Sequence, residues 1–249
     1  MTNSQNQPTS NSTKTLKKRF YGWNIVLASA LTNGFGGSVH WQGFTVFFIP
    51  ISQSLGLTAA QTAMPFALSR AENGLTGPIT GWLLDRYGVR RLMLIGTIMT
   101  GVGYVWLSQT STFLAFLLVY LFVISLGSST SFMQASTTAI NTWFSRNRGV
   151  AMSINSAAFR LGGAFMVPLL SVAVLRWGWE TAAMWVGVGM LVFIAPLAFV
   201  FKRSPESIGV GPDGDPLKES ESGHKINDGE IQDSEDEWTA RQAVRTRAF

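Results

Sequence analysis

Two long stretches of the chain, residues 20–69 and residues 92–145, contain no Asp, Glu, Lys or Arg. A helix needs only about 20 apolar residues to cross the hydrocarbon core of a bilayer, so each stretch can hold two crossings joined by a short loop. The positions of Gly, Pro and flanking charges divide the apolar regions further. The pattern predicts an all-α membrane protein with six transmembrane helices, over residues 22–48, 60–84, 92–108, 113–142, 150–174 and 179–201.

Basic residues gather in alternate connections between the predicted helices. One side holds Lys14, Lys17, Lys18, Arg19, Arg86, Arg90, Arg91, Arg146, Arg148, Lys202 and Arg203, and the other side holds Arg176. Because Lys and Arg accumulate in short cytoplasmic loops, this asymmetry supports an even number of crossings. It predicts an integral protein of the cell membrane, plasma or inner, with both termini in the cytoplasm.

The composition agrees with lipid as the main surrounding medium. Of the 249 residues, 47% are hydrophobic and 13% are charged, whereas soluble domains have about 25% charged residues. The net charge of +5 comes from clusters at helix ends that set orientation, so nucleic acid is not an expected partner. The chain has no cysteine and two histidines, and it contains no zinc-protease, nucleophile-elbow or phosphate-loop motif. We therefore expect neither enzyme activity nor a metal or cofactor.

Four regions follow from these shifts in composition. Residues 1–19 form a polar cytosolic tail and residues 20–203 form the transmembrane bundle. Residues 204–237 carry many acidic residues and few basic ones, which predicts a disordered cytosolic linker. Residues 238–249 are basic and favour a juxtamembrane helix. This helix either leads toward a missing seventh crossing, which we favour, or lies on anionic lipid.

The loop between the second and third predicted helices carries the most specific motif. It contains a glycine, then Asp-Arg, then a glycine and a basic pair: Gly81, Asp85, Arg86, Gly88, Arg90 and Arg91. This loop resembles the loop between helices 2 and 3 of the major facilitator superfamily. The resemblance implies the N-terminal six-helix half of that fold, built from two inverted three-helix repeats. It also implies a gating role for these residues, because the family uses this loop to latch its two halves on the cytoplasmic side.

Further stretches resemble the monocarboxylate-transporter and oxalate/formate-antiporter branch of this family. These are Tyr21-Gly22-Trp23, Thr45-Val46-Phe47-Phe48 and Pro205-Glu206-Ser207-Ile208-Gly209. One departure concerns Gln42, which occupies the position of a substrate-linked lysine in the animal monocarboxylate carriers. The resemblance covers nearly all of residues 20–249 and implies the N-terminal half of a longer transporter together with its central loop.

Three charged residues lie within predicted crossings: Arg70 and Glu72 in the second and Arg160 in the fifth. A charge at mid-membrane costs about 2.5–3.5 kcal/mol on insertion scales, so each should face a cavity or a partner. In one interpretation they line the transport path, where an arginine fork suits a carboxylate. In the other, Glu72 neutralises one of the arginines within the bundle.

Uncharged polar residues also recur at helical spacing in two crossings. Asn33 and His40 lie on one face of the first crossing, near Gln42, and His40 either couples proton movement or is a hydrogen-bonded group that does not titrate. The fourth crossing carries a polar stripe of Ser131, Gln134, Thr138 and Asn141. Such a stripe either wets a cavity or bonds helices together, and the family geometry favours the cavity.

These observations predict a secondary transporter of a small organic solute, a carboxylate or other anion, that works by alternating access. Its partners would be membrane lipid, the small-molecule substrate, a coupled proton or counter-anion, and a C-terminal six-helix half. A six-helix subunit acting as a homodimer is one alternative. A membrane scaffold or sensor that does not transport, and whose acidic linker captures partners, is the other.

Overall fold

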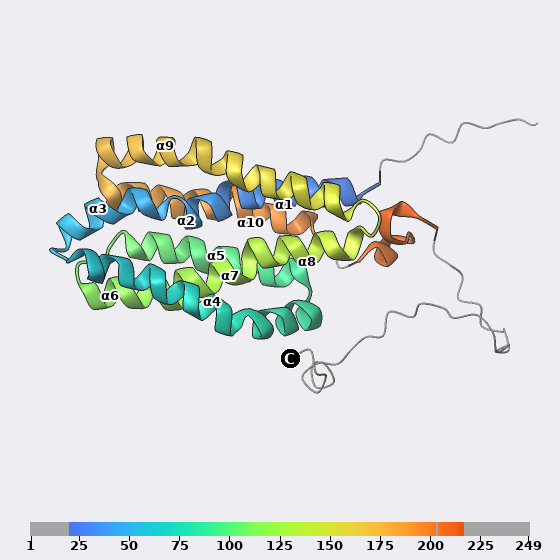
Figure 1. Cartoon of the computed structure of the whole chain (residues 1–249), viewed down its shortest axis with the longest axis horizontal. Coiled ribbons are helices and arrows are strands. Elements are labelled where there is room, and N and C mark those ends of the chain that lie inside the picture. The colour runs from blue at the N-terminus through green and yellow to red at the C-terminus, as the bar shows by residue number, and fades with distance from the viewer. Residues whose placement is uncertain (1–19, 203, 217–249) are drawn as a thin grey trace, which may run out of the picture. The chain divides into compact units, whose positions relative to one another are not determined.

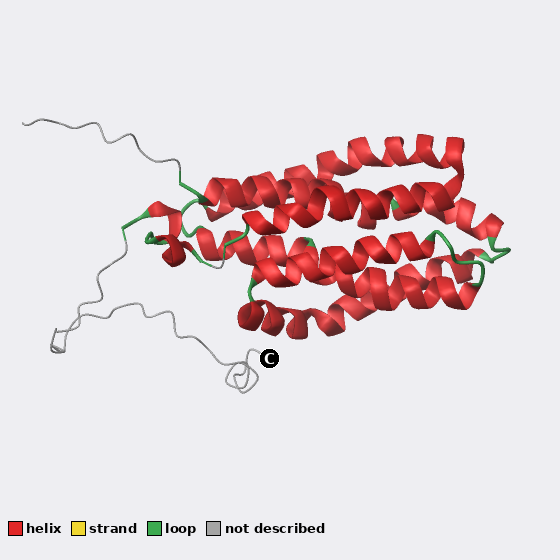
Figure 2. Cartoon of the chain, turned by 180° about the vertical axis from the view of Figure 1, so that it is seen from behind, coloured by secondary structure: helices red, strands yellow, loops and turns green. Residues whose placement is uncertain are grey.

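The computed structural model describes residues 20–202 and 204–216. The expected polar tail, the rest of the acidic linker and the basic segment 238–249 lie outside the described residues. Helices pack side by side in the described part of the chain (Figure 1), which contains no strand (Figure 2). The all-α class is therefore confirmed for this part.

The described residues form six long helical runs. The first joins α1 (Gly22–Thr32), the π-helical turn η1 (Asn33–Gly37), α2 (Ser38–Trp41) and α3 (Phe44–Ser54). The second and third are α4 (Ala59–Tyr87) and α5 (Val89–Leu107). The fourth comprises α6 (Phe113–Leu118), the π-helical turn η2 (Val119–Ser125), α7 (Leu126–Ser131) and α8 (Met133–Trp143). The fifth and sixth runs share α9 (Arg148–Gly189), which is divided by a kink at Gly178. The sixth run continues through η3 (Met190–Ile194), α10 (Ala195–Leu197) and η4 (Ala198–Val200).

Local sequence explains where several of these helices begin and end. α4 begins at a capping box in which Thr58 accepts a hydrogen bond from the amide of Gln61, and the Gln61 side chain accepts one from Thr58. Gly88, with φ of 82°, separates α4 from α5, and Gly178, also at 82°, bends α9 into two parts. Glycine adopts this backbone conformation without the penalty of a Cβ. The breaks fall between the ranges predicted for successive crossings.

Two continuous helical segments, Phe113–Trp143 and Arg148–Val200, the second of which spans the last two runs, are long and apolar enough to cross a membrane, with mean hydropathies of 2.1 and 2.2. The bundle also carries large apolar side chains on its outer surface, including Leu75, Phe165 and Leu175, which is 85% exposed. A surface of this kind is typical of contact with lipid. The number of crossings remains a prediction.

Close backbone contacts hold the helices together. A Cβ added at Gly162 of α9 would lie 1.8 Å from the carbonyl oxygen of Gly34, so glycine is required where α9 crosses the first run. Small residues bring membrane helices into this kind of contact. One apolar cluster surrounds Phe116, Tyr120 and Phe132, and a second surrounds Trp143 near the start of α1.

Residues 204–216 differ from the disordered linker expected there. They form two short 3-10 turns, η5 (Pro205–Ile208) and η6 (Pro212–Gly214). η6 contacts α8, and Asp213 is hydrogen-bonded to the loop before α9. Proline fixes φ at the start of each turn. The segment buries few apolar side chains, and hydrogen bonds from the bundle hold it in place.

Candidate functional site

Arg70 lies on α4 above an aromatic platform. Its guanidinium carbon is 5.0 Å from the ring centre of Trp41 in α2 and 4.8 Å from that of Phe66. Phe66 in turn stacks on Phe44 at 4.6 Å. The face of an aromatic ring attracts a cation, so the platform orients the guanidinium. The Arg70 side chain is exposed, and within residues 20–202 and 204–216 no carboxylate lies within 4.0 Å of it.

Arg160 lies on α9 and has similar surroundings. It is exposed, and its guanidinium carbon is 5.8 Å from the ring centre of Phe159. The described residues give it no carboxylate partner within 4.0 Å. The alternative interpretation, in which Glu72 forms an ion pair with Arg70 or Arg160, is therefore not observed in this structure.

Gln42 connects the surroundings of these two arginines. It follows Trp41, which contacts Arg70, and its side-chain amide donates a hydrogen bond of 3.1 Å to the carbonyl of Phe159, the residue before Arg160. Gly163 leaves room for this side chain, since a Cβ there would lie 1.9 Å from Oε1 of Gln42. The structure thus places Trp41 against Arg70 and the adjacent Gln42 against the backbone of α9 next to Arg160, although the sequence places these segments far apart.

Asn33 is buried between the first run and α9. Its side-chain nitrogen donates a hydrogen bond of 3.0 Å to the side-chain oxygen of Asn155. Asn155 was not among the predicted site residues, although an asparagine within an apolar helix is a signal that could have indicated it. The pair fixes the contact between the first and fifth runs.

His40 is completely buried among α2, α5 and α7. Its Nε2 lies 3.0 Å from the hydroxyl of Ser128 and its Nδ1 lies 3.5 Å from the hydroxyl of Tyr104. Tyr120 stacks on the ring with a centroid distance of 6.0 Å. His40 is therefore buried behind Trp41, whose ring it contacts edge-on at 5.2 Å, whereas Arg70 and Arg160 are exposed.

The polar stripe runs along α7 and α8 from a buried residue to an exposed one. Ser131 is buried and donates to the carbonyl of Gly127 at 2.8 Å, whereas Gln134 and Thr138 are half-buried and Asn141 is exposed. Thr138 also lines a small pocket of about 200 Å³ together with Asp85 and Gly88. The stripe and the loop after α4 therefore meet at one end of the bundle.

The predicted loop is helical except at Gly88: Asp85 and Arg86 lie in the last turns of α4, and Arg90 and Arg91 lie in the first turn of α5. This junction presents a basic surface at that end. A pocket of about 270 Å³ is lined by Arg86, Arg90, Arg91 and Lys202, among other residues. Arg90 lies 4.8 Å from the ring centre of Phe199 and Arg86 lies 5.8 Å from that of Trp82. Asp85 is exposed, and a Cβ added at Gly81 would meet no other atom within 4 Å.

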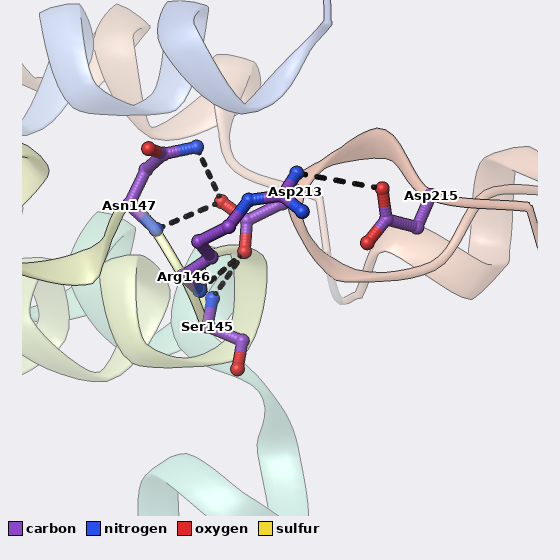
Figure 3. Close-up of polar contacts among 5 residues, drawn as sticks. All are labelled: Ser145, Arg146, Asn147, Asp213 and Asp215. Carbon is purple, nitrogen blue, oxygen red and sulfur yellow. Dashed lines mark hydrogen bonds and ion pairs between the residues drawn. The ribbon is translucent and has the colours of Figure 1, made fainter.

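Asp213 forms a cluster at the same end that sequence reasoning missed. Its carboxylate accepts hydrogen bonds from the backbone amides of Ser145, Arg146 and Asn147 at 2.8, 2.6 and 3.2 Å (Figure 3). It also accepts one from the Asn147 side chain at 3.0 Å, and Arg146 pairs with Asp215 at 3.6 Å. Partial burial works against the ionised form, but these donors outweigh it and hold the pKa of Asp213 below its ordinary value. The Pro-Asp-Gly turn was the available signal, since Asp213 adopts a φ of 59°.

A helical bundle with large apolar side chains on its exterior is typical of an integral membrane protein. The family model described as Major Facilitator Superfamily matches residues 23–247. The chain belongs to this family.

Curated relatives refine the position within the family. The probable sulfoacetate transporter SauU of Cupriavidus necator is 30% identical over 63% of this chain and 36% of its own length. The oxalate:formate antiporter of Oxalobacter formigenes is 27% identical over 79% of this chain and 46% of its own length. Mouse monocarboxylate transporter 2 is 26% identical over 64% and 33%. The predicted resemblance to the monocarboxylate and oxalate/formate branch is confirmed, and the chain spans less than half the length of each of these relatives.

A solved structure shows the same fold. A peptide transporter POT (E310Q mutant), crystallised with alafosfalin, superposes with a TM-score of 0.54 at 20% identity. The match covers 81% of this chain and 41% of the transporter. The likeness to this structure concerns the fold alone.

Proposed function

We propose that the chain supplies one six-helix bundle of a secondary transporter for a small organic anion, with Arg70 and Arg160 as anion ligands. The observation that carries the proposal is the pair of exposed guanidinium groups, both oriented by aromatic rings and linked through Trp41 and Gln42. A carboxylate or sulfonate fits this arrangement because an arginine presents a planar fork of donors. The named substrates of the relatives, sulfoacetate, oxalate and formate, support an anion of this class.

The depth of the two arginines requires that something covers them. Arg70 lies 11 residues after the first residue of α4, and Arg160 lies 12 residues after the first residue of α9. With a rise of 1.5 Å per residue, each is about 16–18 Å from the start of its helix. Exposure to lipid at that depth would cost about 2.5–3.5 kcal/mol per charge. We therefore infer that this face lines a water-filled cavity closed by a second bundle, from the same polypeptide or from a second copy.

The equal spacing of the arginines supports an internal inverted repeat. In such a fold the second and fifth crossings correspond, run in opposite directions and place their central residues around a shared site. Alternating access then requires the two bundles to rock about this site. In this proposal the loop with Asp85 and Arg86 forms a gate on the cytoplasmic side, where it contacts the second bundle in one conformation and separates from it in the other.

The distribution of basic residues supports the proposed orientation. Arg86, Arg90, Arg91 and Lys202 line one pocket at the junction of α4 and α5. In Figure 1 this junction lies at the same end of the bundle as the turn between α8 and α9, which contains Arg146, whereas the kink of α9, next to Arg176, lies at the other end. The positive-inside rule then supports a cytoplasmic location for the first end, as predicted for both termini. Because the chain contains no cysteine, single cysteines at Ser145, in the turn before α9, and at Ser111, in the turn before α6, can be labelled separately in membranes, and both positions are exposed. Labelling of Ser111→Cys from the cytoplasmic side would contradict the orientation.

Anion binding can be measured on the purified protein in detergent. Oxalate, formate and sulfoacetate are the probes, and the readout is the concentration at which each raises the thermal unfolding temperature. Loss of one charge-assisted hydrogen bond costs about 1.5–3 kcal/mol, so Arg70→Gln and Arg160→Gln should each weaken binding by about 10- to 100-fold. Arg176→Gln, on the same helix as Arg160 but outside the site, is the matched control.

Flux in proteoliposomes separates transport from a scaffold role. Uptake of a radiolabelled anion that binds in the first assay should depend on both arginines. The proposal is wrong if Arg70→Gln and Arg160→Gln bind and transport the anions as the parent protein does.

A further inference from the structure

Glu72 is a carboxyl group in the middle of α4 that the anion site does not use. It lies 13 residues from the start and 15 residues from the end of the helix. Both of its carboxyl oxygens are buried, and neither has a hydrogen-bond partner among residues 20–202 and 204–216. Ser125 of η2 faces the carboxyl and is its hydrogen-bonding neighbour, although the Ser125 hydroxyl makes no hydrogen bond of ordinary distance and angle.

No cation compensates this carboxyl within the part of the chain described. Arg70 is two positions away on the same helix, so the two side chains do not face each other. α4 packs against α3, α5, α6, η2, α7 and α8. The charged or titratable residues on these elements are Arg90, Arg91 and Tyr104 of α5 and Tyr120 of η2. None of the arginines pairs with Glu72 within 4.0 Å, Tyr104 faces His40, and the Tyr120 hydroxyl has no hydrogen-bond partner of its own.

Groups outside the bundle are also unable to neutralise Glu72 in this conformation. Its oxygens have almost no accessible surface when this chain is considered by itself. Atoms already covered by their own bundle cannot touch a second bundle or a bound anion unless α4 or its neighbours move. An ionised carboxylate without donors or a counter-ion is strongly disfavoured at this depth, and such a group takes up a proton instead.

We propose that Glu72 is a proton-binding site and holds a proton in the conformation described here. The neutral acid can donate through its hydroxyl and accept through its carbonyl, so it matches Ser125, which also does both. Release of the proton requires a conformation in which water or a cation reaches the carboxyl. Glu72 thereby links its proton to the opening and closing of the bundle.

The second part of the inference rests on the proposed function. If the protein carries an organic anion, Glu72 supplies the proton that moves with it. One proton and one monoanion enter from the same side, and both leave on the other side, where the carboxyl becomes accessible again. Charge is balanced in this cycle, because the anion and the proton cross together.

Infrared spectroscopy tests the proton site without any substrate. The purified protein at neutral pH should show the carbonyl stretch of a protonated carboxylic acid, with the shift in D₂O expected of an exchangeable proton. Glu72→Gln, which has the shape of the neutral acid, should remove this band. Glu180→Gln is the matched control, because Glu180 is an exposed glutamate on α9 and its removal should leave the band unchanged. A spectrum of the parent protein without the band overturns the proposal, even if the variant fails to fold.

Proteoliposomes loaded with buffer test the coupling, with formate, a monoanion at neutral pH, as the probe. For one monoanion moved with one proton, each unit of imposed pH difference should change the accumulation ratio about tenfold. Glu72→Gln should abolish this response while exchange of internal for external anion continues. An unchanged response to pH in Glu72→Gln would overturn the coupling. Absence of any anion flux, with the infrared band still dependent on Glu72, would instead refute the proposed function and leave the proton site standing.

Discussion

Replacement of Asp213 by asparagine should loosen the connection between α8 and α9. One carboxylate oxygen accepts from the amides of Ser145 and Arg146, and the other accepts from the amide and side chain of Asn147. An asparagine keeps only one acceptor oxygen and turns an amine toward the remaining donors. Hydrogen bonds to a charged group contribute about 1.5–3 kcal/mol, and screening by solvent at this surface position reduces the expected loss to about 1–2 kcal/mol.

Amide hydrogen exchange of residues 145–147 measures this effect locally. A loss of about 1–2 kcal/mol corresponds to a factor of about 5–30 in the equilibrium for local opening, and exchange should accelerate by that factor. Asp215→Asn is the matched control, because it removes only the exposed ion pair with Arg146 at 3.6 Å, whose contribution should be small. Equal acceleration in both variants, or none in Asp213→Asn, would refute the assignment.

The same cluster predicts the direction of a pH effect. Hydrogen bonds hold the pKa of Asp213 below its ordinary value. A lowered pKa in the folded state stabilises the cluster above the pKa of the unfolded chain, about 3.9 for Asp, and this stabilisation is lost as the pH falls through the folded-state pKa. Protection of the three amides, corrected for intrinsic exchange, should therefore be constant near neutrality and fall in acid, and this fall should be absent in Asp213→Asn.

Three further predictions concern packing and backbone geometry. Gly162→Ala should cost about 1–3 kcal/mol or prevent folding, because its Cβ would lie 1.8 Å from the carbonyl oxygen of Gly34. In the control Gly74→Ala the added Cβ meets no atom within 4 Å, so the unfolding temperature in detergent should not change. Equal effects of the two substitutions would contradict the packing argument. Asn155→Leu should leave the buried Asn33 amide without its acceptor and lower the free energy of unfolding by about 1–3 kcal/mol. The double variant Asn33→Leu/Asn155→Leu should recover part of this loss. If the losses in the two single variants simply add in the double variant, the two asparagines are not coupled. Gly88→Ala should cost about 1–3 kcal/mol, because its φ of 82° with ψ of 151° is a backbone conformation found almost only in glycine. Thermal unfolding measured against Gly81→Ala tests this, and a neutral result would show that the break between α4 and α5 tolerates a Cβ.

The sequence by itself determined the class of the protein and most of its helices. Charge-free stretches and clusters of basic residues can be read directly from the sequence. Whether a segment inserts into the bilayer depends on its own length and polarity and not on its contacts with other helices. The predicted ranges 113–142 and 179–201 therefore lie close to the helical runs 113–143 and 179–200. The loop motif from Gly81 to Arg91 likewise indicated the family, which the match over residues 23–247 confirmed.

Only the tertiary structure decided which polar residues meet. Asn33 pairs with a residue 122 positions away, Gln42 bonds a carbonyl 117 positions away, and Asp213 reaches back to the amides before α9. Helical spacing places a residue on a face of its own helix, but the rotation and crossing of the helices select the face that it meets. For this reason Glu72 and Arg70, two positions apart in the sequence, lie in different surroundings: the carboxyl is covered by neighbouring helices and the guanidinium is open.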